Sequence, residues 1–180
     1  MALQTEDRRS ARTREALLAA FLKVLFARGY DGMTVGDVVA EANVGRSTFY
    51  EHFAGKEELL AFSFRMPFGV LADIVGVEAV SDSTLRLLVH FRERRKLGPA
   101  LFSATMRPLL SRTLAALIEP RLGDAKAIVP RRLVALQIAE AQLALIDAWI
   151  SGRAACTSEA MAAALHASTN ALGRAMYRFA

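Results

Sequence analysis

One short segment of the chain is dense in side chains that can bind DNA bases and phosphates. The run from 34 to 56 is TVGDVVAEANVGRSTFYEHFAGK, and its second half holds guanidinium, hydroxyl and imidazole groups at Arg46, Ser47, Thr48, Tyr50 and His52. Arginine can bond two acceptors on guanine in the major groove, and hydroxyl groups commonly contact phosphates. A helix that only packs into a core needs none of these groups. The segment therefore predicts contact with DNA.

These groups need a frame that turns them outward, and the residues before them predict one. Thr34 can cap the free amides of a first helix in which Val38 and Val39 face inward. Asn43 tolerates a left-handed backbone and Gly45 favours one, so the chain can turn sharply before a second helix. Two short helices joined by such a turn form a helix-turn-helix.

An apolar face should fix the second helix to a core. Phe49 and Phe53 are four residues apart and therefore share one side of the helix. The hydrogen-bonding residues are then left on the other sides, where a partner can reach them.

The same residues resemble the TetR family of bacterial one-component transcriptional regulators, over the stretch from Phe26 to Leu60. The matching elements stand at fixed spacing and are Gly29 with Tyr30, Thr34, Val44, Thr48, Phe49 with Tyr50, His52 with Phe53, and Lys56 with Glu57. The departures are modest: Gly45 stands where the family commonly has Ser, Ser47 where Gly is usual, and Val39 where Ala is usual. Because Gly caps a helix nearly as well as Ser, none of these removes a required element.

The geometry and the resemblance together give each polar residue an expected role. Arg46 is the candidate for reading guanine. The others are expected to touch a base edge or a phosphate (Ser47 and Thr48) or to fix phosphates (Thr34, Tyr50, His52 and Lys56). Outside such a motif, Tyr50 would be read as a packing aromatic and His52 as a solvated surface histidine.

The whole chain is predicted to be all-α, with two domains. Residues 1–54 should form a three-helix helix-turn-helix DNA-binding head, and residues 55–180 a helical body for ligand binding and dimerisation. Helical periodicity and the positions of Pro and Gly predict three helices in the head, over about 10–28, over 34–42 and from residue 46. A fourth should begin near residue 55 and continue until Pro67 breaks or bends it. The remaining helices are predicted over about 83–97, 99–106, 108–121, 130–151 and 158–178.

The helix predicted over 130–151 bears on assembly because it is apolar on two opposite sides. Such a helix must be buried twice, either within one chain or against a second copy. The resemblance implies that the last two helices form a homodimer interface, although which face of the first takes part stays open. The expected interface residues are Leu136, Leu143, Ile146, Ile150, Met161, Leu165, Leu172 and Met176.

The resemblance also implies that the body binds a small-molecule inducer that releases DNA. Candidate lining residues are Phe64, Phe68, Leu71, His90, Phe102, Met106 and Trp149. An apolar residue in a helical body is more often simply core. The function expected of the whole is a repressor that binds an inverted-repeat, double-stranded DNA operator as a homodimer.

Composition agrees with this interpretation and argues against other classes. The net charge of +5 does not mark the DNA-binding part, because residues 1–62 hold eight Lys and Arg against nine Asp and Glu. A single cysteine, a polar N-terminus and the lack of an 18-residue apolar run predict a cytoplasmic protein with no membrane partner.

Two competing classes have less support from the residues. The three histidines are far apart, and phosphate-binding glycine loops and paired metal ligands are lacking, so no enzyme, metal or cofactor is expected. The alternative to a DNA-binding regulator is an all-helical protein-interaction module, for which the charged run at 91–96 could serve.

Overall fold

A computed structural model describes residues 2–123 and 127–176, with side chains described from Arg8 onward, and confirms the all-α fold. The chain divides into two compact units, one up to Ser63 and one from Phe64. The boundary was predicted after residue 54, but it lies inside a helix. The reason is that the first two turns of that helix bury Leu59 and Leu60 in the N-terminal core.

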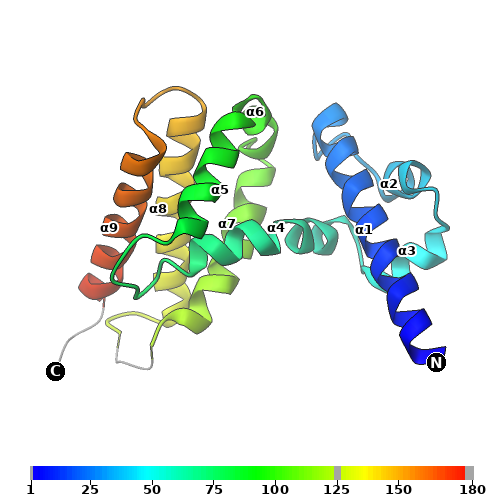
Figure 1. The fold of residues 1–180 in the computed structure, drawn as a ribbon, viewed down its shortest axis with the longest axis horizontal. Coiled ribbons are helices and arrows are strands. Elements are labelled where there is room, and N and C mark those ends of the chain that lie inside the picture. Colours follow the sequence, from blue (N-terminus) through cyan, green and yellow to red (C-terminus); the bar gives the residue numbers. More distant parts are fainter. Residues whose placement is uncertain (1, 124–126, 177–180) are drawn as a thin grey trace. The chain divides into compact units, whose positions relative to one another are not determined.

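The N-terminal unit contains three helices and the beginning of a fourth (Figure 1). Helix α1 spans Ala2–Arg28, α2 spans Val35–Ala42 and α3 spans Arg46–His52, and α4 begins at Lys56. Helix α1 starts earlier than the predicted residue 10 and ends as predicted at Gly29, whose φ of 71° is left-handed. The core of this unit is formed mainly by Leu17, Phe21, Leu25, Val38 and Phe49.

Helix α2 is held at its N-terminus by a reciprocal cap. The Asp37 amide donates to the Thr34 hydroxyl over 3.2 Å, and the Thr34 amide donates to the Asp37 carboxylate over 2.8 Å. Arg28 at the end of α1 also pairs with that carboxylate. One side chain therefore caps α2 and joins it to α1.

We expect this cap to make the stability of the N-terminal unit depend on pH. The hydrogen bond with the Thr34 hydroxyl, followed by that with the Thr34 amide and the charge of Arg28, lowers the pKa of Asp37 below its ordinary value. A carboxyl group whose pKa is lower in the folded state adds stability above its unfolded pKa and loses that contribution as the pH falls through the folded value. Urea unfolding should show Asp37→Asn less stable than wild type at pH 7, and the gap should narrow below about pH 4. A gap that is constant with pH would contradict this role.

Helix α4 spans Lys56–Ala72 and contains Pro67 in its interior. Of the two expected effects of Pro67, a break or a bend, the break is therefore wrong and the bend stays a prediction. Proline cannot donate a hydrogen bond to the carbonyl four residues earlier, here that of Ser63. The helix nevertheless continues, because Phe68, Leu71 and Ala72 beyond the proline are buried in the C-terminal core. Burial of these side chains outweighs the loss of one backbone hydrogen bond.

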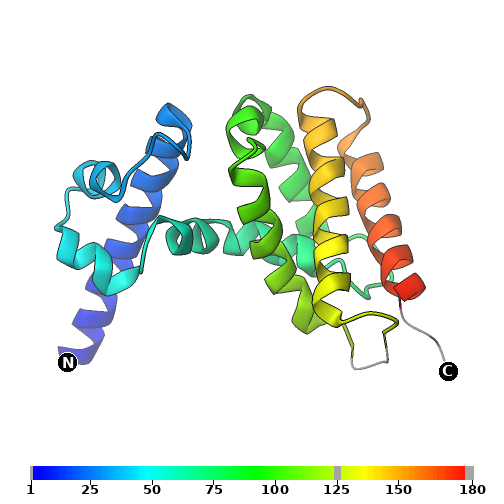
Figure 2. The ribbon, with the colours of Figure 1, turned by 180° about the vertical axis from the view of Figure 1, so that it is seen from behind.

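The C-terminal unit is a helical bundle built from the end of α4 and helices α5 (Asp82–Glu93), α7 (Met106–Ile118), α8 (Arg131–Ile150) and α9 (Ser158–Met176). Figures 1 and 2 show α7, α8 and α9 side by side, with α8 in the middle. Short turns of helix connect them: η1 (Arg95–Leu97), α6 (Gly98–Leu101) and η2 (Glu119–Arg121).

The helix boundaries in this unit differ from the prediction where prolines were read as breaks. Helix α5 ends at Glu93 rather than at 97, and the predicted helix over 99–106 is only the single turn α6. Helix α7 starts at Met106, before Pro108, because a proline in the first turn removes no hydrogen bond. The charged run at 91–96 is mostly solvated. Residues 177 and 178 of the last predicted helix lie outside the described part of the chain.

Most residues on the two apolar sides of helix α8 are buried within one chain. Five of the eight residues expected at a dimer interface are buried in the core of this unit: Leu143, Ile146, Ile150, Met161 and Leu165. Because α8 packs between α7 and α9, these side chains face helices of the same chain, and their place at a dimer interface stays a prediction. Leu136 is exposed, and Leu172 and Met176 are partly exposed.

By length and composition α8 is also apolar enough to cross a membrane, but half of its most apolar window is buried inside the bundle. A central core helix has the same composition, so this feature is weak evidence for a membrane span.

Candidate nucleic-acid interface

Helix α3 is anchored by its apolar side and exposed on the other. Phe49 has no exposed surface and Phe53 has 3%, and their ring centroids lie 6.0 Å apart. Tyr50 meets Phe49 edge to face at 5.3 Å, yet 58% of Tyr50 is exposed. The pair of phenylalanines was predicted correctly and fixes which residues of α3 face outward.

The turn before α3 is built by Asn43 rather than by glycine. Asn43 takes the left-handed conformation, with φ of 53°, and the Val44 amide donates to the Val39 carbonyl over 3.1 Å. Gly45 is extended, with φ of −73°, and forms the N-cap without a side-chain hydrogen bond. A Cβ at Gly45 would make only ordinary contacts, so serine would fit there.

The predicted contact residues occupy two levels of exposure. Arg46, Ser47 and Tyr50 on α3, and Thr34 before α2, are exposed, whereas Thr48 and His52 are half-buried. The His52 ring leans toward Phe53, with centroids 6.4 Å apart. Each of these residues therefore keeps some of its surface exposed.

The guanidinium of Arg46 lies back across the start of α2. A Cβ added at Gly36 would stand 3.1 Å from the Arg46 Nη2 atom. Gly36 therefore leaves room for this side-chain position. Sequence reasoning missed Gly36, since no spacing rule links it to Arg46. It also missed the cap at Asp37, which the T-x-x-D spacing could have revealed.

The Lys56 side chain is bound within the protein. Its ammonium group donates to the carbonyls of Tyr30 and Met33, each over 3.1 Å, and lies 4.3 Å from the centre of the Tyr30 ring. The ammonium group thus ties the start of α4 to the loop that precedes α2. Its expected contact with a phosphate stays a prediction, since an ammonium group has three N–H donors and two are used here.

We expect removal of the Lys56 ammonium group to destabilise the N-terminal unit. Lys56→Met keeps the aliphatic stem but leaves two partly buried carbonyls without this donor, which should cost about 1–3 kcal/mol. Lys23→Met is the matched control, because the Lys23 side chain is 70% exposed and pairs with Glu41 at the surface. That surface pair should be worth less than about 1 kcal/mol. Urea unfolding that gives equal losses for both variants would refute the assignment.

The expected ligand-binding residues differ in exposure, and their role stays a prediction. Four of them, Phe68, Leu71, Met106 and Trp149, are buried core residues, and His90 is exposed. Phe64 and Phe102 are partly exposed, and Phe64 contacts Phe68 with centroids 5.2 Å apart.

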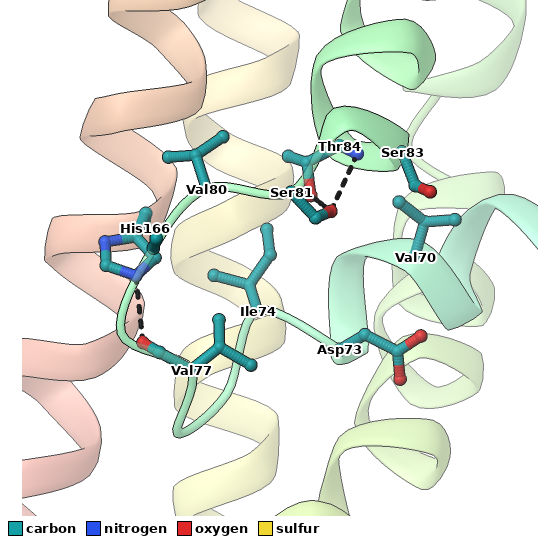
Figure 3. A pocket seen from close by; sticks show the side chains of 10 residues that line it. Val70, Asp73, Ile74, Val77, Val80, Ser81, Ser83, Thr84 and His166 are labelled. Atoms are coloured by element: carbon teal, nitrogen blue, oxygen red, sulfur yellow. Dashed lines mark hydrogen bonds between the residues drawn. The ribbon is translucent and has the colours of Figure 1, made fainter.

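A cavity of about 320 Å³ is instead lined by the end of α4, the loop after it, the start of α5 and one residue of α9 (Figure 3). None of the seven expected residues is among its lining residues. The prediction therefore missed this cavity. The cavity is formed in part by a loop, and helical periodicity in the sequence does not specify the path of a loop. Among the described residues, no cluster of His, Cys, Asp and Glu could hold a metal ion.

The segment that forms the helix-turn-helix is similar to known regulatory proteins. Residues 17–61 match the family model described as bacterial regulatory proteins, tetR family. Over 55 residues the chain is 54% identical to the HTH-type transcriptional regulator YxbF of Bacillus subtilis (strain 168), a match that covers 30% of this chain and 14% of that protein.

A second relative is the HTH-type dhaKLM operon transcriptional activator DhaS of Lactococcus lactis subsp. lactis (strain IL1403). It is 31% identical over 64 residues, which are 36% of this chain and 34% of that protein. The chain therefore matches about a third or less of the length of these two relatives.

Solved structures share the fold over almost the whole chain. The TetR transcriptional regulator from Streptococcus agalactiae 2603V superposes with a TM-score of 0.59 at 24% identity, covering 93% of this chain and 99% of that one. The dihydroxyacetone kinase operon activator DhaS gives a TM-score of 0.50 at 18% identity, covering 92% and 98%. The exposed α3, its buried anchor and the family match lead to one conclusion: residues 17–61 form a helix-turn-helix segment of the kind found in bacterial regulatory proteins of the tetR family.

Proposed function

We propose that this protein is a sequence-specific DNA-binding transcriptional regulator that acts as a homodimer. The observation that carries the proposal is the presentation of α3, whose Arg46, Ser47 and Tyr50 are exposed while Phe49 is fully buried beneath them. An α-helix fits the major groove, where each base pair shows a distinct pattern of donors and acceptors. The family match of the same segment supports this function.

The outward faces of α8 and α9 supply a surface for the second copy. On α8, Leu133 and Leu136 are 52% and 37% exposed. On α9 the exposed positions that share one side are small, namely Ala160, Ala163, Ala164 and Ala167. In a two-fold dimer the two copies of α3 would enter major grooves about 34 Å apart, so the operator would be an approximate inverted repeat.

Regulation would follow from occupancy of the operator. A dimer on a promoter blocks polymerase without a dedicated activation surface, so we propose repression, with release of DNA when a small molecule binds the body. The similar protein DhaS is named as an activator, so whether this protein represses or activates transcription needs its own measurement. A reporter placed behind the operator should rise when the gene is deleted, and a fall would overturn repression.

The DNA-binding function is tested by letting the purified protein select DNA sequences from a random duplex library. Salt should be near physiological, because nonspecific phosphate binding weakens steeply as salt rises. Enrichment of an inverted repeat, together with a dimeric mass by light scattering, would support the proposal. No enrichment by protein with a native circular dichroism spectrum would favour a helical protein-interaction module.

A further inference from the structure

The cavity at the end of α4 combines an apolar wall with a rim of polar groups. Its apolar side chains come from α4 and the following loop: Val70, Ile74, Val77, Ala79 and Val80. Figure 3 shows Val70 and His166 on opposite sides of it, with Ile74, Val77 and Val80 between them. A volume of about 320 Å³ is at the lower end of the range for small-molecule sites, so the cavity suits a compact ligand.

The polar groups around this cavity are engaged with other protein groups. Asp73 accepts from Arg121 over 2.7 Å, and Ser83 accepts from Arg86 over 3.2 Å. The Ser81 hydroxyl accepts from the Thr84 amide over 3.1 Å as the N-cap of α5. No lysine or arginine is among the lining residues, and the one carboxylate, Asp73, is already paired. A charged ligand would lose water without gaining an unpaired partner, whereas an apolar one would be covered by branched aliphatic side chains.

The loop that forms one side of the cavity is held to α9 by a set of hydrogen bonds, which we call the latch. The Asn170 carbonyl oxygen accepts from the Gly76 amide over 2.9 Å, and its amide group donates to the carbonyls of Ile74 and Val77 over 3.3 Å. The His166 Nε2 atom donates to the Val77 carbonyl over 2.9 Å, since a carbonyl can only accept. A ligand in the cavity therefore touches this latch directly.

The last turn of α4 is held by a second, buried contact. Gln142, with 1% of its surface exposed, donates to the carbonyl of Leu71 over 3.1 Å and to the Thr169 hydroxyl over 2.9 Å. The helix that begins in the DNA-binding unit thus ends in a polar network shared with α8 and α9.

From these contacts we infer that the cavity is an effector site for a compact, uncharged molecule with an apolar body. Its occupancy shifts the latched loop and the end of α4, and thereby changes affinity for DNA. This second step rests on the proposed function, whereas binding itself does not.

Binding can be tested with the full chain and three molecules that share one body. Cyclohexylmethanol is the uncharged probe, and cyclohexanecarboxylate and cyclohexylmethylamine are its anionic and cationic counterparts. Calorimetry should show cyclohexylmethanol binding at least tenfold more tightly than either ion. An ion that binds as tightly would overturn the ligand class, and no saturable binding of the alcohol would overturn the site.

A matched pair of variants tests the location. Val80 lines the cavity and is 39% exposed, whereas Val89 on α5 does not line it and is 40% exposed. Val80→Trp should abolish binding of cyclohexylmethanol, and Val89→Trp should leave it unchanged. Equal binding to both variants would place the probe elsewhere. If Val80→Trp does not fold, Ala79→Phe, at another residue that lines the cavity, takes its place.

The regulatory step is tested with the selected operator. Saturating cyclohexylmethanol should change operator affinity at least threefold for wild type and Val89→Trp, and not for Val80→Trp. Unchanged affinity despite measured binding would overturn the regulatory step alone. Probe binding by a protein that selects no operator would instead refute the proposed function while the effector site stands.

Discussion

Replacement of Phe49 by alanine should unfold the N-terminal unit at much lower denaturant than wild type. Phe49 has no exposed surface and packs against Tyr50 and Phe53, with ring centroids at 5.3 and 6.0 Å. Truncation of a buried phenylalanine removes its transfer free energy and leaves a cavity, at a cost of about 3–5 kcal/mol. Stabilities of whole domains are about 5–15 kcal/mol, so little would remain for a unit this small.

The single tryptophan allows the two units to be followed separately. Trp149 lies in α8 of the C-terminal unit, so its fluorescence reports that unit, while circular dichroism reports the helices of both. Phe49→Ala should shift a circular dichroism transition to lower urea and leave the fluorescence transition in place. Tyr50→Ala is the control, because Tyr50 is 58% exposed and its loss should cost under about 1 kcal/mol. Equal shifts for both variants would refute the anchoring role of Phe49.

Replacement of Arg46 by alanine should weaken binding to the selected operator by about 1–3 kcal/mol, a factor of roughly 5 to 150, and affect random DNA far less. The reason is that a planar guanidinium can bond both acceptors of guanine, which a phosphate contact does not require. Arg46→Lys keeps the charge but loses the paired donors. It should therefore bind random DNA as wild type does, but lose most of the preference for the operator over random DNA.

Fluorescence anisotropy with operator and scrambled duplexes at two salt concentrations would measure both effects. Arg92→Ala serves as a control, because Arg92 is an exposed arginine on α5 of the other unit. Equal losses on operator and scrambled DNA for Arg46→Ala would show that Arg46 contacts phosphate rather than bases.

The N-terminal unit was largely predictable because its signals are local. The spacing of Phe49 and Phe53 gave the buried side of α3, and Asn43 gave the turn, since left-handed backbone favours very few residue types. The reciprocal cap at Thr34 and Asp37 spans only four residues and was also within reach of a sequence rule.

The C-terminal unit was less predictable because its decisive contacts join distant residues. The apolar pattern of α8 correctly required burial on two sides, but it could not tell a neighbouring helix from a second copy, and Leu143 and Ile146 proved to be core. The latch joins Asn170 to Gly76, 94 residues away, and no periodicity connects these positions. The sequence around Pro67 left a break and a bend open, because the burial of Phe68 and Leu71 beyond it depends on the tertiary fold.

The alanines on the outward side of α9 have a consequence for the entropy of association. Alanine has no side-chain rotamers to lose when it is covered, whereas a lysine or glutamate would lose about 1.5–2 kcal/mol. A copy that docks on Ala160, Ala163, Ala164 and Ala167 would therefore give up almost no side-chain freedom. Each methyl group also covers little area, so the strength of such a contact would depend on how closely the two helix backbones approach.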